Sequence, residues 1–472
     1  MPADIPSDAP DAGVPAPDGT ATPAPPSAQS PSAQQPDNGA QVRTGSTISG
    51  LDDLIGRLTN LLADHQILEV EKLVDDSDAE STTKSEPKAG AKLTPQQSQL
   101  YRGVIANREN KPQESIHLLE PLVAQMQSPG LAPEEKLLRR TLAEDYLRAG
   151  DFRKAAQAYQ DYESRLGATL SADEQDEIEL PLKLLPLVAA YPSMTVEPGD
   201  AFSLPYDRDP LGLTDLPVFV DAQSHDWMLD PTAPFNLICR STAREVGLRI
   251  SEQSAVVHTI TGRPITVHAT LIPRFTVGTV TYRNMTAFVF EDADYAFPHS
   301  GYQVRGVLGY PAVSALGSLT ITANAKVEVQ PGSKGEHLTS GARFFLDGDR
   351  VLVGVGRPGD ERMFVLDAAG QQTYLTSRYY AEHEAEFEHQ KMQLLSVPGS
   401  QNKPPAPAYI ADSVKLLIGD ATVTFHNMQV LPEPLGSAAL DDTYGTLGMD
   451  ALDELKSYTF DYRTMRFAAK SQ

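Results

Sequence analysis

Two aspartates in the C-terminal half of the sequence stand in matching surroundings. Asp230 and Asp367 each end a short apolar run, at 227–229 and 364–366, and each is followed by turn-forming or small residues. Two carboxylates that a fold holds close together cannot both ionise freely, so they share one proton and titrate in two separated steps. Such a pair supplies one acid and one base at a single site. These two residues are therefore the candidates for catalytic chemistry.

The surroundings of the two aspartates recur in the same order, which indicates an internal duplication. An aliphatic residue lies eight positions after each aspartate. Farther along each half, an aliphatic residue precedes a glycine, and the separation from aspartate to glycine is 79 residues for Gly309 (309 − 230) and 81 residues for Gly448 (448 − 367). We therefore expect two copies of one fold, at about 217–333 and 341–472.

The pattern that must position these residues is a β pattern. From about residue 194 onward, short β-branched and apolar runs alternate with Gly, Pro, Asn and Asp, for example at 216–220, 265–270 and 282–290. The glycine-rich run at 354–359 is followed by a strand-like run and contains proline, so it predicts a turn between strands rather than a nucleotide site.

No cofactor or metal is expected from the motifs of this region. The segment 383–389 begins and ends with histidine, but it carries Phe387 at the position where a zinc-binding helix needs its second histidine. The segment therefore predicts an acidic, solvated helix face.

The N-terminal part of the sequence predicts a helical module behind a tether. Residues 1–48 are rich in Pro, Ala and Ser and favour disorder, and the polar stretch 75–92 predicts a linker. Between them, apolar residues at helical spacing predict a helix from Leu51 to about Leu73. Further helices of this module, which covers 49–190, are expected at 95–108, 112–126, 132–148, 152–166 and 171–188.

Residues 142–159 resemble a tetratricopeptide repeat. Gly150 and Asp151 separate two helices, and small residues on the second helix allow close approach to the first. A weaker copy precedes this stretch at 98–126. An independent array needs about three repeats, so two copies are expected to pack on the rest of the chain. The resemblance implies a protein-binding or supporting role for these helices.

Composition narrows the classes of partner. The formal net charge is −24 and the pI is about 4.8, which disfavours nucleic acid because both surfaces are negative. The single cysteine, Cys239, excludes an intrachain disulfide. No window approaches about 18 consecutive apolar residues, so no transmembrane segment is expected. No signal peptide is visible at Met1, but the Pro/Ala/Ser tract that follows is compatible with a removed signal, and a periplasmic or secreted bacterial protein is expected.

The duplicated marks resemble those of the pepsin-like and retropepsin-like aspartic peptidases. An aspartate after an apolar strand, small residues after it and a distal aliphatic–glycine pair occur in both halves. The resemblance covers about 195–472 and implies two lobes, 195–335 and 341–472, so the expected fold is multi-domain, an α module followed by a bilobal all-β domain. It implies that Asp230 and Asp367 meet on a pseudo-twofold axis, where one activates water and the other hydrogen-bonds the scissile carbonyl.

The turns after the aspartates depart from the family pattern Asp-Thr/Ser-Gly. The next residue normally supplies a hydroxyl and an N–H that lock the two turns together, but Pro231 has neither group and Ala368 has no hydroxyl. The position after that is normally glycine, and here Thr232 and Ala369 keep the N–H but add a Cβ to the turn. Loss of the interlocking bonds is expected to leave the two acids loosely held.

Three functions remain open at this level. The altered turns favour a degenerate scaffold that binds extended polypeptide in a cleft between the lobes, with Thr232, Ala369, Gly309 and Gly448 as turn-supporting residues. The second function is an active aspartic endopeptidase. The third is a scaffold in which the tetratricopeptide-like helices bind a protein partner and the β domain is passive. The sequence does not determine the oligomeric state.

Overall fold

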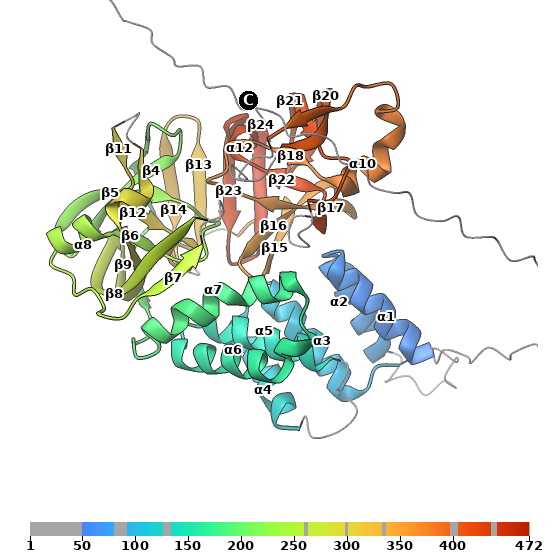
Figure 1. Ribbon diagram of the computed structural model, residues 1–472, viewed down its shortest axis with the longest axis horizontal. Coiled ribbons are helices and arrows are strands. Elements are labelled where there is room, and N and C mark those ends of the chain that lie inside the picture. The colour runs from blue at the N-terminus through green and yellow to red at the C-terminus, as the bar shows by residue number, and fades with distance from the viewer. Residues whose placement is uncertain are drawn as a thin grey trace, which may run out of the picture. The chain divides into compact units, whose positions relative to one another are not determined.

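The computed structural model describes residues 50–79, 92–125, 134–258, 263–297, 301–332, 337–396, 405–435 and 441–471 (Figure 1). The expected tether at 1–48 and residues 80–91 of the expected linker lie outside this part of the chain. Among the described helices, none has the length and apolar character needed to cross a membrane.

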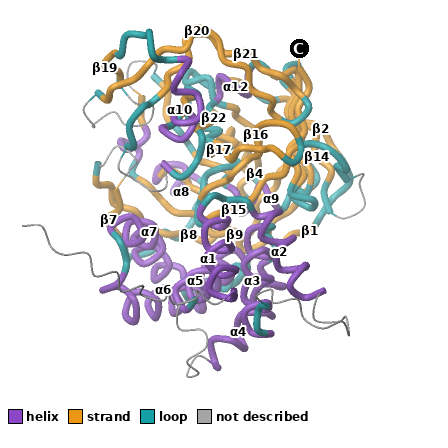
Figure 2. Tube along the Cα trace, turned by 90° about the vertical axis from the view of Figure 1, so that its right-hand side faces the viewer, coloured by secondary structure: helices purple, strands orange, loops and turns teal. Residues whose placement is uncertain are grey.

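The N-terminal part folds into helices in which each packs against the next, as Figure 2 shows in purple. Their bounds are α1 (Gly50–Ala63), α2 (Ile67–Ala79), α3 (Pro95–Arg108), α4 (Pro112–Gln125), α5 (Glu135–Arg148), α6 (Phe152–Leu166) and α7 (Ala172–Val188). The predictions for α3 to α7 are confirmed to within three residues at every end. Helix α3 begins with the expected cap, in which Thr94 accepts a hydrogen bond from the Gln97 N–H and Pro95 occupies the first turn.

The prediction of one helix from Leu51 to about Leu73 is wrong. The chain breaks at His65, whose φ is 55°, and α2 then continues to Ala79, inside the segment predicted as a linker. No glycine or proline marks this break. The His65 side chain is 4% exposed and is bound by acids of the β region, so a tertiary interaction holds the residue in its left-handed conformation.

Two sheets follow the helices. The first contains, in order across the sheet, β1 (Thr195–Glu197), β9 (Val280–Phe290), β6 (Leu237–Cys239), β12 (Gly306–Leu308), β5 (Gln223–Leu229), β4 (Thr214–Val220), β8 (Pro264–Val277) and β7 (Ala255–His258), with β3 (Asp207–Arg208) beside β4. The strands predicted at 216–220, 265–270 and 282–290 are confirmed.

The second sheet also draws strands from the first half of the β region. Its order is β19 (Gln393–Leu395), β20 (Ala406–Ile418), β21 (Ala421–Val430), β18 (Tyr374–Leu375), β22 (Gly445–Leu447), β17 (Asp360–Leu366), β16 (Arg350–Arg357), β15 (Ala342–Asp347), β24 (Arg466–Ser471), β23 (Leu455–Asp461), β13 (Ser318–Thr322), β14 (Lys326–Gln330) and β2 (Phe202–Pro205). The glycine-rich run at 354–359 is the end of β16 and the turn into β17, as predicted.

Short elements complete the β region. They are the helices α8 (Arg240–Glu245), α9 (Tyr310–Ser314), α10 (Ser377–His383) and α12 (Met449–Asp453) and the hairpin of β10 (Ala296–Phe297) with β11 (Tyr302–Gln303). The segment 383–389 is helical only at its start, because α10 ends at His383 and a short 3-10 turn follows.

The two halves repeat the same strand register. Strand β12 pairs in parallel with β5, placing Leu308 opposite Leu229, and β22 pairs in parallel with β17, placing Leu447 opposite Leu366. The same two strands pair antiparallel with β6 and β18, and these pair in parallel with β9 and β21. A repeated arrangement of this kind supports the predicted duplication.

The halves are also joined to each other. Strand β13 pairs antiparallel with β23 over residues 318–322 and 457–461, so hydrogen bonds run continuously from one half to the other. Buried side chains of both halves form one hydrophobic cluster. The helices pack on this β region, because Val257 and Ile265 of the first half lie in the helical core and Phe345 and Met363 of the second half pack with α1 to α3.

A buried acid lies inside the helical module. Asp145 on α5 is 0% exposed and accepts hydrogen bonds from Ser115 Oγ at 2.5 Å and Asn107 Nδ2 at 2.8 Å. Burial raises its pKa to about 7, although the two donors and the nearby Arg148 oppose the shift.

We expect Asp145→Asn to stabilise the protein at pH 8 and to leave its stability unchanged near pH 4. The folded pKa of Asp145 lies above the unfolded value of about 3.9, so the folded state loses stability as pH rises between these values. An amide never ionises, and it keeps the acceptor that Asn107 uses. Chemical denaturation at the two pH values should show a gain of roughly 1–4 kcal/mol at pH 8. Asp161→Asn, at an exposed position of α6, is the control and should change neither value; equal behaviour of the two variants would contradict the prediction.

Candidate functional site

The turn after Asp230 encloses one oxygen of its carboxylate. Oδ1 accepts the Thr232 N–H at 2.9 Å, the Thr232 hydroxyl at 2.6 Å and the Ala233 N–H at 3.1 Å. The strand pairing fixes the position of this turn, because the Asp230 N–H donates to the Leu308 carbonyl at 3.1 Å. The carboxylate is therefore oriented by the backbone of its own turn.

The turn after Asp367 has the same arrangement. Oδ1 accepts the Ala369 N–H at 3.1 Å and the Gly370 N–H at 2.7 Å, and the Asp367 N–H donates to the Leu447 carbonyl at 3.0 Å. The Cβ atoms at positions 232 and 369 thus do not prevent the N–H groups from reaching the acids. In both turns Oδ2 accepts no hydrogen bond from the described residues, which leaves one oxygen of each acid for other partners.

A hydrogen bond connects the two turns across the halves. The Ala368 N–H donates to Thr232 Oγ1 at 3.2 Å, while the same hydroxyl donates to Asp230. The expectation that the altered motifs lose their interlocking bonds is therefore wrong for one bond. Threonine one position later than in the family pattern supplies the missing hydroxyl. The reciprocal bond cannot form, because Pro231 has no N–H and Ala368 has no hydroxyl.

The two acids differ in their electrostatic environment. Asp230 is 7% exposed, and burial raises its pKa above the ordinary aspartate value. The negative charge of Asp367 adds to this increase, whereas hydrogen bonds from Thr232 and Ala233 oppose it. Asp367 is more exposed. The proton of the pair is therefore held preferentially by Asp230.

Gly309 and Gly448 lie where a strand passes closely behind each turn. The Gly309 N–H donates to Asn236 Oδ1 and the Gly448 N–H donates to Thr373 Oγ1, both at 3.0 Å. A Cβ on Gly309 would overlap the Phe235 carbonyl, and one on Gly448 would lie 2.7 Å from backbone atoms of residue 372. Glycine is required at both positions by this close approach.

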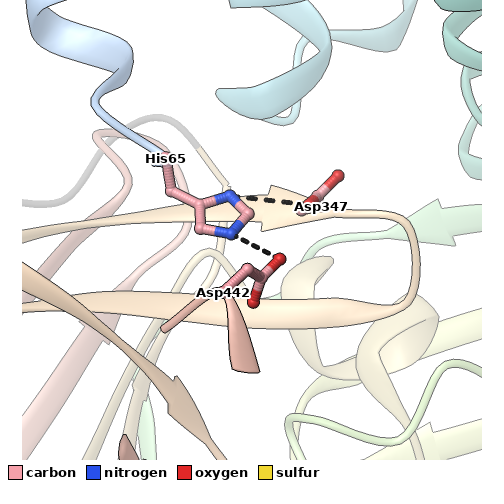
Figure 3. A group of neighbouring side chains, drawn as sticks. All are labelled: His65, Asp347 and Asp442. Atoms are coloured by element: carbon pink, nitrogen blue, oxygen red, sulfur yellow. Dashed lines mark hydrogen bonds and ion pairs between the residues drawn. The ribbon is translucent and has the colours of Figure 1, made fainter. Parts of the chain in front are cut away.

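A second cluster of ionisable groups joins α1–α2 to the second half, and no sequence motif indicated it. His65 lies between Asp442, at 2.9 Å from Nε2, and Asp347, at 3.6 Å from Nδ1 (Figure 3). The three residues offer ligand atoms within 4.8 Å of one another, which is a geometry compatible with a metal ion.

Guanidinium groups occupy the carboxylates of this cluster. Arg350 binds both acids, with contacts of 2.7 Å to Asp347 and 2.8 Å to Asp442, and Arg108 binds Asp347 at 2.7 Å. Burial alone would raise the pKa of Asp347, but the charges of Arg108, Arg350 and Arg140 outweigh it and hold the pKa well below the ordinary value. A cation at this place would face these positive charges, so the donor set fits an ion-pair junction better than a metal site.

Comparisons with known proteins agree with the geometry. A family model described as Aspartyl protease matches residues 216–312, the part that contains the first turn. The β domain is therefore aspartic-protease-like, behind a helical region. No curated protein matches the chain.

Solved structures of similar fold span 58% of this chain, each at 11% sequence identity. They include an aspartic proteinase from Irpex lacteus, with 97% of that chain covered and a TM-score of 0.35, and Basic 7S globulin from soybean, with 96% covered and a TM-score of 0.35. A third is conglutin gamma from lupine seeds, a basic 7S globulin, with 95% covered and a TM-score of 0.36.

The bond between the turns gives a testable stability effect. We expect Thr232→Val to lower the free energy of unfolding by about 1–3 kcal/mol, because it leaves the Ala368 N–H without its acceptor. Thr232→Ser retains the hydroxyl and should recover most of the loss. Denaturant unfolding of the three proteins measures this, and equal losses for valine and serine would show that the hydroxyl is not the stabilising group.

The ion-pair junction should be far more sensitive than a surface ion pair. Arg350→Met leaves two buried carboxylates short of a partner, so we expect a loss of about 3–5 kcal/mol in unfolding free energy. Arg362→Met removes an Arg of the same half that pairs with Asp360 and Glu382 and is 39% exposed, and it should cost less than about 1 kcal/mol. Similar losses in denaturant unfolding would contradict the interpretation of the junction.

Proposed function

We propose that this protein binds an extended polypeptide between its two β halves and hydrolyses a peptide bond with Asp230 and Asp367. The observation that carries the proposal is the Thr232 bridge, in which one hydroxyl binds Ala368 of the opposite turn and the Asp230 carboxylate. The bridge restores a link that the altered motifs had removed. It supports a pair whose relative position is fixed rather than loose.

The chemistry assigns different roles to the two acids. Protonated Asp230 donates a hydrogen bond to the carbonyl oxygen of the scissile bond, consistent with its raised pKa. Ionised Asp367 accepts a proton from a water molecule, whose oxygen forms the new bond to the carbonyl carbon. Proton transfer to the nitrogen then lets the C–N bond break, giving a carboxylic acid and an amine. The unbonded Oδ2 atoms are the oxygens available for these steps.

Two edge strands support polypeptide binding. Strands β7 and β19 end their sheets in the described part of the chain, and each pairs with the strand that follows it, β8 or β20. Each carries an outward apolar side chain, Val256 at 52% exposed and Leu394 at 72% exposed. An extended peptide can add to such an edge by backbone hydrogen bonds, with its side chains covering the apolar residues. The expected flap near 255–268 is the β7–β8 hairpin, of which 259–262 lie outside the described residues.

Binding without hydrolysis is the second candidate function. The asymmetry of the turns favours it, because only one of two reciprocal bonds can form between Pro231 and Ala368. A displacement of about 1 Å in a reacting group can cost on the order of 100-fold in rate. In either case the tetratricopeptide-like helices would support the β domain or bind a further protein partner, in a periplasmic or secreted setting.

Hydrolysis should be confined to acid pH. Cleavage needs Asp230 protonated and Asp367 ionised, so it falls as pH rises through the raised pKa of Asp230 and falls again at low pH when both acids are protonated. We expect an unfolded polypeptide to be cleaved between about pH 3 and 6, and Asp230→Asn or Asp367→Asn to lower the rate by roughly 10³-fold. Peptide release measured by mass spectrometry across the pH range checks this.

Asp226→Asn is the matched control for this experiment. Asp226 lies on the same strand as the turn of Asp230 but is exposed, so its variant should keep the full rate. Wild-type protein that binds the polypeptide and does not cleave it at any pH would leave binding as the function. Cleavage that survives both aspartate substitutions would remove the acid pair from the mechanism.

A further inference from the structure

A cavity of about 370 Å³ lies where the helices meet both halves of the β region. Neither Asp230 nor Asp367 lines it. Its walls come from α5 to α7, from the chain after the first aspartate turn at 234–236 and from the β15–β16 turn at 347–350. Its volume is in the range of sites that hold small organic ligands, about 300–1,000 Å³.

One wall of the cavity is aromatic and apolar. The rings of Phe235 and Phe288 pack edge to face, with centroids 5.0 Å apart, and Phe235 is only partly buried. The other apolar lining residues include Leu147, Phe152, Ile178 and Leu346. A ligand with a ring or a compact hydrocarbon body would remove this surface from water, which is favourable.

The arginines of the cavity are already paired. Arg140 lies 2.9 Å from Glu144 and 2.9 Å from Glu177, and Arg350 contacts Asp347 at 2.7 Å. Arg148 donates to the Gly348 carbonyl at 2.9 Å and approaches Glu144. An anionic ligand would therefore compete with carboxylates that already hold these positive groups.

One acid of the lining has no such partner. The lining carries three arginines and four acids, Glu144, Glu177, Asp347 and Asp349, giving a formal charge of 3 − 4 = −1. Asp349 makes no ion pair or side-chain hydrogen bond with another residue that the structure describes. Burial raises its pKa, against the opposing charge of Arg350. An unpaired carboxylate in such surroundings gains from a cationic partner.

We propose that this cavity is a binding site for a small organic cation, with an ammonium or guanidinium group on Asp349 and an apolar or aromatic body against Phe235 and Phe288. The charge balance selects the cation and the aromatic wall selects the body. The site is separate from the aspartate pair, although residues 234–236 join the cavity wall to the first turn. It adds a small-molecule ligand to a protein whose proposed substrate is a polypeptide.

Titration calorimetry with 2-phenylethylamine tests the proposal on the full chain at about pH 8, where the carboxyl is ionised. The neutral 2-phenylethanol and the anionic 3-phenylpropanoate are the comparison probes. We expect the amine to bind at least about tenfold more tightly than the alcohol, and the anion to bind least. Asp349→Asn should reduce amine affinity at least about tenfold and leave alcohol affinity unchanged, while Phe235→Leu should weaken both.

Controls separate this site from the aspartate pair. Asp412→Asn, at an exposed position of β20, and Asp230→Asn should each keep amine affinity within about twofold. Loss of amine binding in Asp230→Asn would place the cation at the aspartate pair and overturn the assignment. The proposal also fails if Asp349→Asn binds the amine as wild type does, if the anion binds as tightly as the amine, or if wild type binds none of the probes at about 10 mM.

Discussion

The hydroxyl group of Thr232 occupies a position at which three demands meet. It satisfies an N–H of the opposite turn, it donates to the Asp230 carboxylate, and it lies in a loop whose own N–H groups bind the same oxygen. A buried acid with fewer donors would be costly to ionise, and two unconnected turns would let the acids move independently. The spatial relation of the two halves at their shared axis therefore depends on this small group. The glycines behind the turns and the repeated strand register serve the same relation, because they allow both turns to approach the axis.

Much of this architecture follows from local signals in the chain. Helix α3 begins where Thr94 and Pro95 predict it, and α7 begins at a cap in which Ser171 and Glu174 bind each other's backbone N–H groups. The equal spacing from Asp230 to Gly309 and from Asp367 to Gly448 predicted the duplication, because a repeated fold must repeat its close contacts. These features are local, or recur at a fixed distance along the chain.

The missed features depend on partners far away in sequence. His65 and Asp442 are 377 residues apart, and no spacing rule connects them. The break between α1 and α2 follows from the same contact, since neither glycine nor proline is present there. The bridge by Thr232 was missed because the family pattern places its hydroxyl one residue earlier. Threonine at the second position was visible in the sequence, but only the geometry of both turns shows that its oxygen reaches the opposite one.

The pairing of β13 with β23 has a consequence for how the two halves can exist. Each half contributes strands to one ladder, so neither possesses a complete sheet of its own. A fragment that ends between them would present a row of unsatisfied N–H and C=O groups together with apolar side chains such as Leu319 and Phe460. Such an open edge invites pairing with a second copy of itself. Any ancestral single-lobed form with this sheet would thus have been a self-associating protein, and fusion of two copies converts that association into an intramolecular one.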